Sequence, residues 1–81
     1  MEPSRVIAKV PKHLFMPVRY YRYWQSGKGA VFGEKAEAAQ FYEEQAATVL
    51  RHLNQVAVDP EAKLVMHDPA VRFKRPRNGG E

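Results

Sequence analysis

Residues 18–24 read Val-Arg-Tyr-Tyr-Arg-Tyr-Trp, and this stretch is the most informative one of the chain. It holds four of the nine aromatic residues of the chain together with two arginines, and its composition has a strong β-strand propensity. Successive side chains of a strand point to opposite faces, so the odd-numbered members share one predicted face and the even-numbered members share the other. Both faces therefore carry aromatic and cationic groups, although one aromatic face would be enough to build a core.

The two faces of this strand are expected to have different roles. We expect Tyr20 and Trp24 to point inward together with Phe32, a residue of the next predicted strand. The exposed side chains are then expected to be Arg19, Tyr21 and Tyr23. Arg22 would reach solvent past the edge of the sheet. Two interpretations stay open, since the exposed set either binds a partner or only keeps the protein soluble.

The segments around this strand predict a small antiparallel sheet. Strand-forming residues bounded by turn residues occur at 4–10, 18–25, 30–32, 63–66 and 71–74. The sequence Ser-Gly-Lys-Gly at 26–29 predicts a tight hairpin, because glycines supply the positive φ angles that such turns need. Residues 67–70 (His-Asp-Pro-Ala) are typical of a type I turn, so 63–66 and 71–74 are expected to pair as a second hairpin.

A long helix is predicted over residues 34–56, where apolar side chains repeat with a period of about 3.6 residues. The predicted inner stripe consists of Ala38, Tyr42, Ala46, Val49, Leu53 and Val56, flanked by Phe41 and Leu50. His52 projects to the edge of this stripe, near Phe41 and Gln45, and is expected to be a partly buried structural histidine. The fold class is therefore α+β, with an antiparallel sheet of three to five strands packed on one long helix.

The chain of 81 residues is expected to form one domain over residues 1–74, followed by a disordered basic tail at 75–81. Residues 1–33 carry six Lys or Arg against one acid, residues 34–61 carry two against six, and residues 62–81 carry five against two. Positive charge thus gathers at both ends of the chain, and basic patches attract nucleic acid or acidic proteins. Since the chain has no cysteine and no long apolar run, we expect a cytoplasmic protein without disulfides or membrane association.

Residues 32–41 (Phe-Gly-Glu-Lys-Ala-Glu-Ala-Ala-Gln-Phe) resemble the strand-to-helix joint of the arm-type DNA-binding module at the N-terminus of phage tyrosine recombinases. Plant AP2-like domains share that architecture. In this pattern an aromatic residue ends a strand, and an alanine and a second aromatic follow on the inner face of the helix. Phe32, Ala38 and Phe41 match those positions. The resemblance covers about residues 18–46, and it implies that exposed strand residues contact DNA in the major groove while the helix supports the sheet.

Two functions are compatible with these features. The first is a small non-enzymatic module that binds DNA or RNA through the aromatic-basic strand and the basic ends of the chain. Its expected contact residues are Arg19, Tyr21, Arg22, Tyr23, Lys28, Arg75 and Arg77. In this hypothesis the cations meet phosphates, and the tyrosines stack on bases or anchor the partner. The basic tail either extends this footprint or only aids solubility.

The second function is a phage-type inhibitor that binds a protein with the same surface. A small chain with an exposed aromatic-basic strand has the size and style of anti-CRISPR proteins and of other inhibitors of host enzymes. Its partner would be a host protein or a CRISPR-type protein, and it would act in the host-cell cytoplasm if the chain is phage-encoded. Binding that weakens steeply with salt distinguishes nucleic acid from a mostly apolar protein interface.

No catalytic constellation is recognisable in the sequence. The side-chain hydroxyls other than those of tyrosine belong to Ser4, Ser26 and Thr48, and none of them falls in a known nucleophile motif. The three histidines lack the spacing of metal ligands. We therefore expect no enzymatic activity, no metal, no cofactor and no small-molecule substrate.

Overall fold

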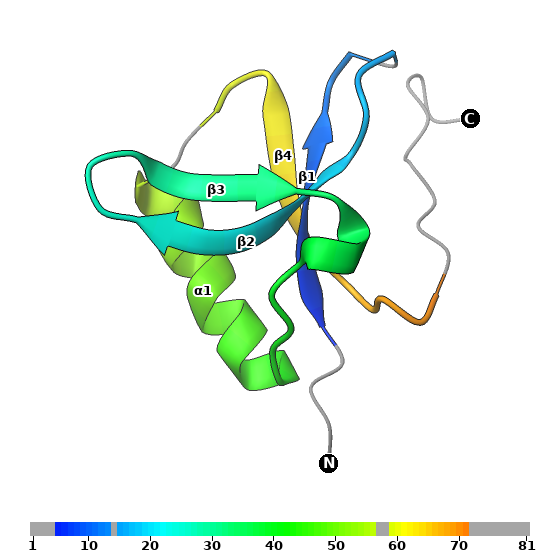
Figure 1. Cartoon of the computed structure of the whole chain (residues 1–81), viewed down its shortest axis with the longest axis vertical. Coiled ribbons are helices and arrows are strands. Elements are labelled where there is room, and N and C mark those ends of the chain that lie inside the picture. The colour runs from blue at the N-terminus through cyan, green and yellow to red at the C-terminus, as the bar shows by residue number, and fades with distance from the viewer. Residues whose placement is uncertain (1–4, 14, 57–58, 72–81) are drawn as a thin grey trace.

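Four strands form one antiparallel sheet in the order β3-β2-β1-β4 (Figure 1). The structure, a computed structural model, describes residues 5–13, 15–56 and 59–71. The strands are β1 (Val6–Pro11), β2 (Arg19–Gln25), β3 (Gly29–Gly33) and β4 (Ala62–His67). A single 3-10 turn, η1 (Lys35–Glu37), and one helix, α1 (Glu43–Val56), lie between β3 and β4 in the described chain. The predicted α+β class, a small antiparallel sheet packed on a helix, is confirmed.

Both faces of the sheet are buried near its centre. Tyr20 and Tyr21 are consecutive residues of β2, so their side chains point to opposite faces, yet they are only 7% and 8% exposed. On the face that α1 covers, Tyr21 packs with Ile7 and Leu53. On the opposite face, Tyr20 belongs to a second cluster around Ala8. The aromatic residues of β2 therefore stabilise two hydrophobic clusters, one on each side of the sheet.

A bulge in β2 reverses the alternation of its side chains. Tyr21 lies opposite Phe32 and Tyr23 lies opposite Val31, so Arg22 is an extra residue without a partner position on β3. Residues opposite each other across two strands share a face. Tyr21 and Tyr23 therefore point to different faces, and the prediction that both lie on one exposed face is wrong.

The same bulge places Tyr20 and Trp24, which were predicted to point inward together, on opposite faces of the sheet. Tyr20 is buried as predicted, but it lies opposite Gly33 and belongs to a different cluster from Phe32. Phe32 instead packs edge-on against Tyr21, with ring centroids 6.0 Å apart. Trp24 lies opposite Ala30, on the α1 face, but 45% of its surface is exposed. Trp24 therefore shares a face with Phe32, as predicted, but it is not enclosed in the core.

The predicted hairpin turn at 26–29 is confirmed between β2 and β3. Gly27 and Gly29 have φ angles of 86° and 91°, which side-chain-bearing residues adopt only with strain. Figure 1 shows the hairpin crossing in front of α1 with its turn projecting beyond β1 and β4. The end of the hairpin thus contacts solvent on one side and the C-terminal half of α1 on the other.

The helix is shorter than predicted, because the segment before it pairs with the sheet. Phe41 exchanges two backbone hydrogen bonds with Arg5, of 2.8 and 3.0 Å, and the Ala39 N–H donates to the Tyr21 carbonyl at 2.9 Å. Backbone groups engaged in this way cannot also form helical hydrogen bonds. The start of α1 is marked by Gln45, whose side-chain oxygen accepts a hydrogen bond from the Tyr42 N–H at 3.1 Å.

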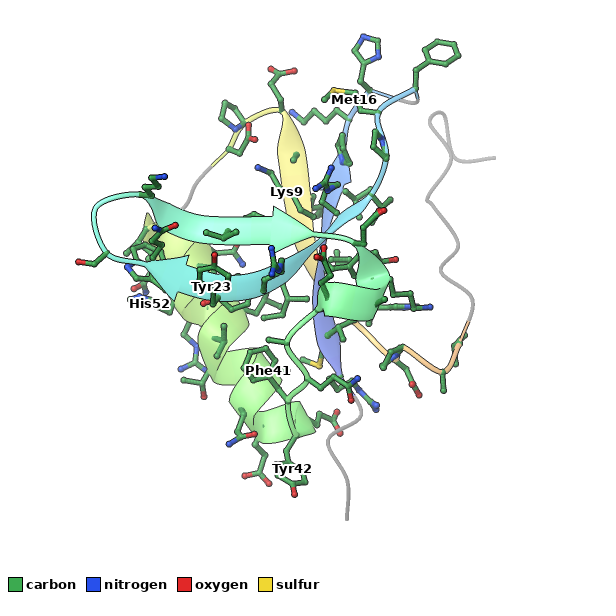
Figure 2. All side chains as sticks on the ribbon, viewed as in Figure 1. Lys9, Met16, Tyr23, Phe41, Tyr42 and His52 are labelled. Atoms are coloured by element: carbon green, nitrogen blue, oxygen red, sulfur yellow. The ribbon has the colours of Figure 1, made fainter. Side chains whose placement is uncertain are left out.

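The inner face of α1 retains only the middle of the predicted stripe. The helix residues that pack against the sheet are Ala46, Val49, Leu50 and Leu53. Tyr42 precedes the helix and is exposed, as the bottom of Figure 2 shows. Val56, the last residue of α1, is also exposed. Phe41 still contributes to the core, because its ring stacks on Tyr21 at 6.3 Å.

The last described strand has a different partner from the predicted one. β4 pairs with β1 over its whole length, from Pro11 opposite Ala62 to Val6 opposite His67. A turn follows β4, but it spans residues 68–71, one residue later than predicted, since the Val71 and Ala70 N–H groups donate to the carbonyl and carboxylate oxygens of Asp68. The second arm predicted at 71–74 lies outside the described residues except for Val71, which belongs to no strand.

Candidate functional site

The β2–β3 hairpin concentrates positive charge and exposed aromatic surface. No Asp or Glu occurs between Glu2 and Glu34, so residues 19–33 carry three cations and no acid. These cations are Arg19, Arg22 and Lys28. Two half-exposed rings accompany them, Tyr23 with 46% and Trp24 with 45% of their surface exposed. Because the two rings are consecutive, each face of the hairpin presents one of them.

Trp24 lies on the α1 side of the hairpin. Its ring is 6.1 Å from the ring of His52 on α1, and Figure 2 shows His52 behind the hairpin and Tyr23 on its near side. His52 is exposed and neighbours Trp24, so the prediction of a partly buried histidine beside Phe41 is wrong. The prediction failed because Phe41 precedes α1 and therefore does not share a helical face with His52.

A hollow of about 360 Å³ opens beside Trp24, between the hairpin turn and the end of α1. Its lining includes Trp24, Lys28, Gly29 and Phe32. Gly29 has no side chain in the space beside the tryptophan ring, where a Cβ would make an ordinary van der Waals contact with Trp24 Cη2 at 3.9 Å. The hollow therefore combines the exposed indole with a lysine.

Lys9 of β1 also lines this hollow. Its Nζ lies 4.9 Å from the centroid of the Phe32 ring and 3.1 Å from Asp59 Oδ2. The other carboxylate oxygen of Asp59 accepts a hydrogen bond from the Glu61 N–H at 2.9 Å. This backbone hydrogen bond and the Lys9 ammonium hold the pKa of Asp59 below its ordinary value.

A second hollow, of about 380 Å³, lies beyond Phe32 toward the β1–β2 loop. Arg19 lines it together with Met16, Pro17 and Glu61. The two hollows share three lining residues, Lys9, Phe32 and Asp59. The two hollows therefore lie side by side, and together they are called here the Lys9 groove, with Lys28 and Trp24 at one end and Arg19 at the other. Figure 2 places Lys9 between the hairpin and the loop that carries Met16.

Arg22 and Tyr23 lie together on the opposite face of the hairpin. The Arg22 guanidinium is 5.3 Å from the centroid of the Tyr23 ring and 3.9 Å from the Glu37 carboxylate of η1. Arg22 also covers Gly33, where a Cβ would approach the arginine Cδ to 2.6 Å. The Arg22 side chain therefore lies over β3, the edge strand, toward η1, and 35% of it is exposed.

Tyr21 is a core residue and is removed from the candidate contact set. Its ring contacts those of Phe32 and Phe41, and burial raises the pKa of its hydroxyl. Stacking on a base needs an exposed ring face, which Tyr21 lacks. The prediction that Tyr21 is exposed is wrong, because α1 covers the face of the sheet to which its side chain points.

The predicted site residues thus lie on two different faces of the hairpin. Arg19 and Lys28 lie on one face at the two ends of the Lys9 groove, while Arg22 and Tyr23 lie on the other face. The sequence analysis included neither Lys9 nor Trp24 among the candidate contact residues. A signal for Lys9 was present, because it is the only charged residue within the strand Val6–Pro11. Arg75 and Arg77 lie outside the described residues.

Two further properties of the described chain concern metals and membranes. The residues that the structure describes include no cluster of three or more acidic, histidine or cysteine side chains that could hold a metal ion. Neither of their helical segments has the length and apolarity needed to cross a membrane.

Comparison with models of protein families, with curated proteins and with solved structures finds no match to this chain.

Proposed function

We propose that the protein is a non-enzymatic nucleic-acid-binding module that uses its β2–β3 hairpin. The observation that carries this proposal is the composition of the hairpin surface, which has three cations, no acid and two half-exposed aromatic rings. Cations neutralise phosphates and release counterions, and exposed aromatic rings stack on bases. One hairpin that carries both kinds of group has the chemistry that such polymers require.

The charge of the other elements also favours the hairpin over the helix. The first turn of α1 carries Glu43 and Glu44, while η1 is preceded by Glu34 and ends at Glu37. These carboxylates would repel a phosphate backbone. The proposed use of strand residues agrees with the resemblance of residues 18–46 to arm-type DNA-binding modules, whose helix supports the sheet.

A salt titration of binding tests this function. Affinity for labelled DNA and RNA is measured at several salt concentrations for the wild type and for the double variant Arg19→Ala/Lys28→Ala. We expect the logarithm of the affinity to fall linearly with the logarithm of the salt concentration, and the double variant to reduce this slope by about two units.

The matched control is Lys35→Ala/Arg51→Ala, which removes the same charge from η1 and α1. This control should retain the wild-type slope to within about half a unit. Absence of binding to any nucleic acid at low salt would refute the proposal. Equal effects of the two double variants would refute the role of the hairpin.

A second function, inhibition of a host or CRISPR-type protein, is favoured by one specific observation. Phe15 in the β1–β2 loop is 93% exposed, and the neighbouring Met16 is also exposed. Exposed apolar side chains of this size are typical anchors of protein interfaces. If the partner is a protein, Phe15→Ser should weaken its capture while leaving the thermal stability of the free chain unchanged.

A further inference from the structure

We infer that the Lys9 groove is a binding site for single-stranded nucleic acid, in which an unpaired base stacks on Trp24. This inference rests on the proposed function and names its ligand and its face. It assigns binding to the α1 side of the hairpin, and it excludes Arg22 and Tyr23 on the other side from the main contact.

The end of the groove beside Trp24 has the size and lining of a base-binding pocket. Its volume of about 360 Å³ falls within the range of about 300–1,000 Å³ that is typical of ligand pockets. Trp24 is half exposed there, and the residues next to it on β3, Gly29 and Ala30, are small. A planar base therefore has both an aromatic surface to stack on and space beside that surface.

The charges of the groove are arranged for a chain of phosphates. Lys28 marks the Trp24 end and Arg19 marks the opposite end, and no described acid lies within ion-pair distance of either cation. The acids of the groove are Asp59 and Glu61. Asp59 is engaged by Lys9 in the middle, and Glu61 lies toward the Arg19 end. The Trp24 end is therefore the more positive one.

Stacking on Trp24 selects an unpaired strand for a geometric reason. In a duplex the faces of the bases are covered by their neighbours, and the phosphates lie outside. A base can reach a tryptophan in a groove between the hairpin and α1 only when it is free to turn away from its own strand. Duplex DNA can still contact Arg19 and Lys28, but it gains nothing from Trp24.

The experiment compares two labelled ligands by fluorescence anisotropy, an oligothymidylate of about ten nucleotides and a duplex of the same length. Trp24→Ala should weaken binding of the single strand by about 5- to 150-fold and leave duplex binding unchanged. Trp24→Phe should retain most of the affinity, because it retains an aromatic face. Tyr23→Ala is the matched control, since Tyr23 is the neighbouring, equally exposed ring on the opposite face.

Each outcome decides the inference. A loss with Trp24→Ala, little loss with Trp24→Phe and no loss with Tyr23→Ala would support it, provided that circular dichroism shows all variants folded. Tighter binding of the duplex than of the single strand, or a greater loss with Tyr23→Ala than with Trp24→Ala, would overturn the inference but leave the proposed function standing. Absence of binding to both ligands would overturn the two together.

Discussion

The ammonium group of Lys9 lies 3.1 Å from the carboxylate of Asp59, and this pair joins β1 to the turn before β4 in the middle of the groove. Both side chains are partly exposed, so the pair is accessible to a competing anion. A phosphate that binds Lys9 has to compete with Asp59 for the same ammonium group. The pair therefore connects the stability of the fold with the affinity of the proposed site.

Replacing Asp59 by asparagine is expected to increase the affinity for single-stranded nucleic acid. The amide oxygen can still accept the hydrogen bond of the Glu61 N–H, while Lys9 loses its charged partner. We expect tighter binding and a salt slope that is steeper by about one unit. Asp68→Asn is the matched control, because Asp68 makes the same kind of turn hydrogen bond and lines neither hollow of the groove. Equal gains in the two variants would show a general charge effect.

The lowered pKa of Asp59 makes the stability of the fold depend on pH. The Glu61 N–H and the Lys9 ammonium keep the pKa of Asp59 below its ordinary value of 3.8 in the folded protein. The unfolded chain therefore binds the proton first as the pH falls. The stabilising contribution of Asp59 is complete above pH 3.8 and is lost as the pH falls through the lower, folded-state value. Thermal melts of the wild type and Asp59→Asn should differ at pH 6 and converge in strong acid. Glu61→Gln, in the same turn, serves as the control.

Tyr21→Ala is expected to destabilise the fold much more than Tyr23→Ala. The Tyr21 side chain is buried between Phe32 and Phe41. Its removal leaves a cavity, and truncation of a buried aromatic residue lowers the free energy of unfolding by about 3–5 kcal/mol. Tyr23 is half exposed on the other face of the hairpin, so its truncation should cost less than about 1 kcal/mol. Chemical denaturation of the two variants measures the difference. Similar losses would contradict the assignment of faces by the bulge.

Arg19→Ala should weaken nucleic-acid binding more than Arg22→Ala. Arg19 is exposed, and no described acid pairs with it, whereas Arg22 is shared between Glu37 and the Tyr23 ring. Loss of a phosphate contact at Arg19 should reduce the salt slope by about one unit, and loss of Arg22 should leave it nearly unchanged. The test is a salt titration of both variants. A larger effect of Arg22→Ala would move the interface to the opposite face of the hairpin.

Gly27→Ala should destabilise the hairpin through backbone strain alone. A Cβ at Gly27 would meet no atom within 4 Å, but the residue has a φ of 86°. An alanine in this conformation lowers the free energy of unfolding by about 1–2 kcal/mol. This loss corresponds to a decrease of roughly 4–16 °C in the melting temperature of a domain of this size. Ser26→Ala, in the same exposed turn, is the control and should melt close to the wild type.

Local patterns in the sequence determined most of the secondary structure. The strand at 18–25, the glycine turn at 26–29 and the returning strand at 30–32 were predicted to within one residue. The helical period also identified Ala46, Val49 and Leu53 as inner residues of α1. These features depend on residues close together in the chain, whose propensities and periodicity can be read directly.

The candidate site depended on relationships that no local pattern contains. The start of α1 is set by Phe41, which pairs with Arg5 far away in the sequence, and this backbone pairing prevents an earlier helix. The bulge at Arg22 exists only in the register between β2 and β3. That one extra residue exposes Trp24 on the α1 face and leaves Tyr23 on the other face. Since the side-chain period of a strand is two residues, a shift of one residue exchanges its faces. The sequence therefore determined which residues form the hairpin, and only the tertiary structure decided which of them lie together in the groove.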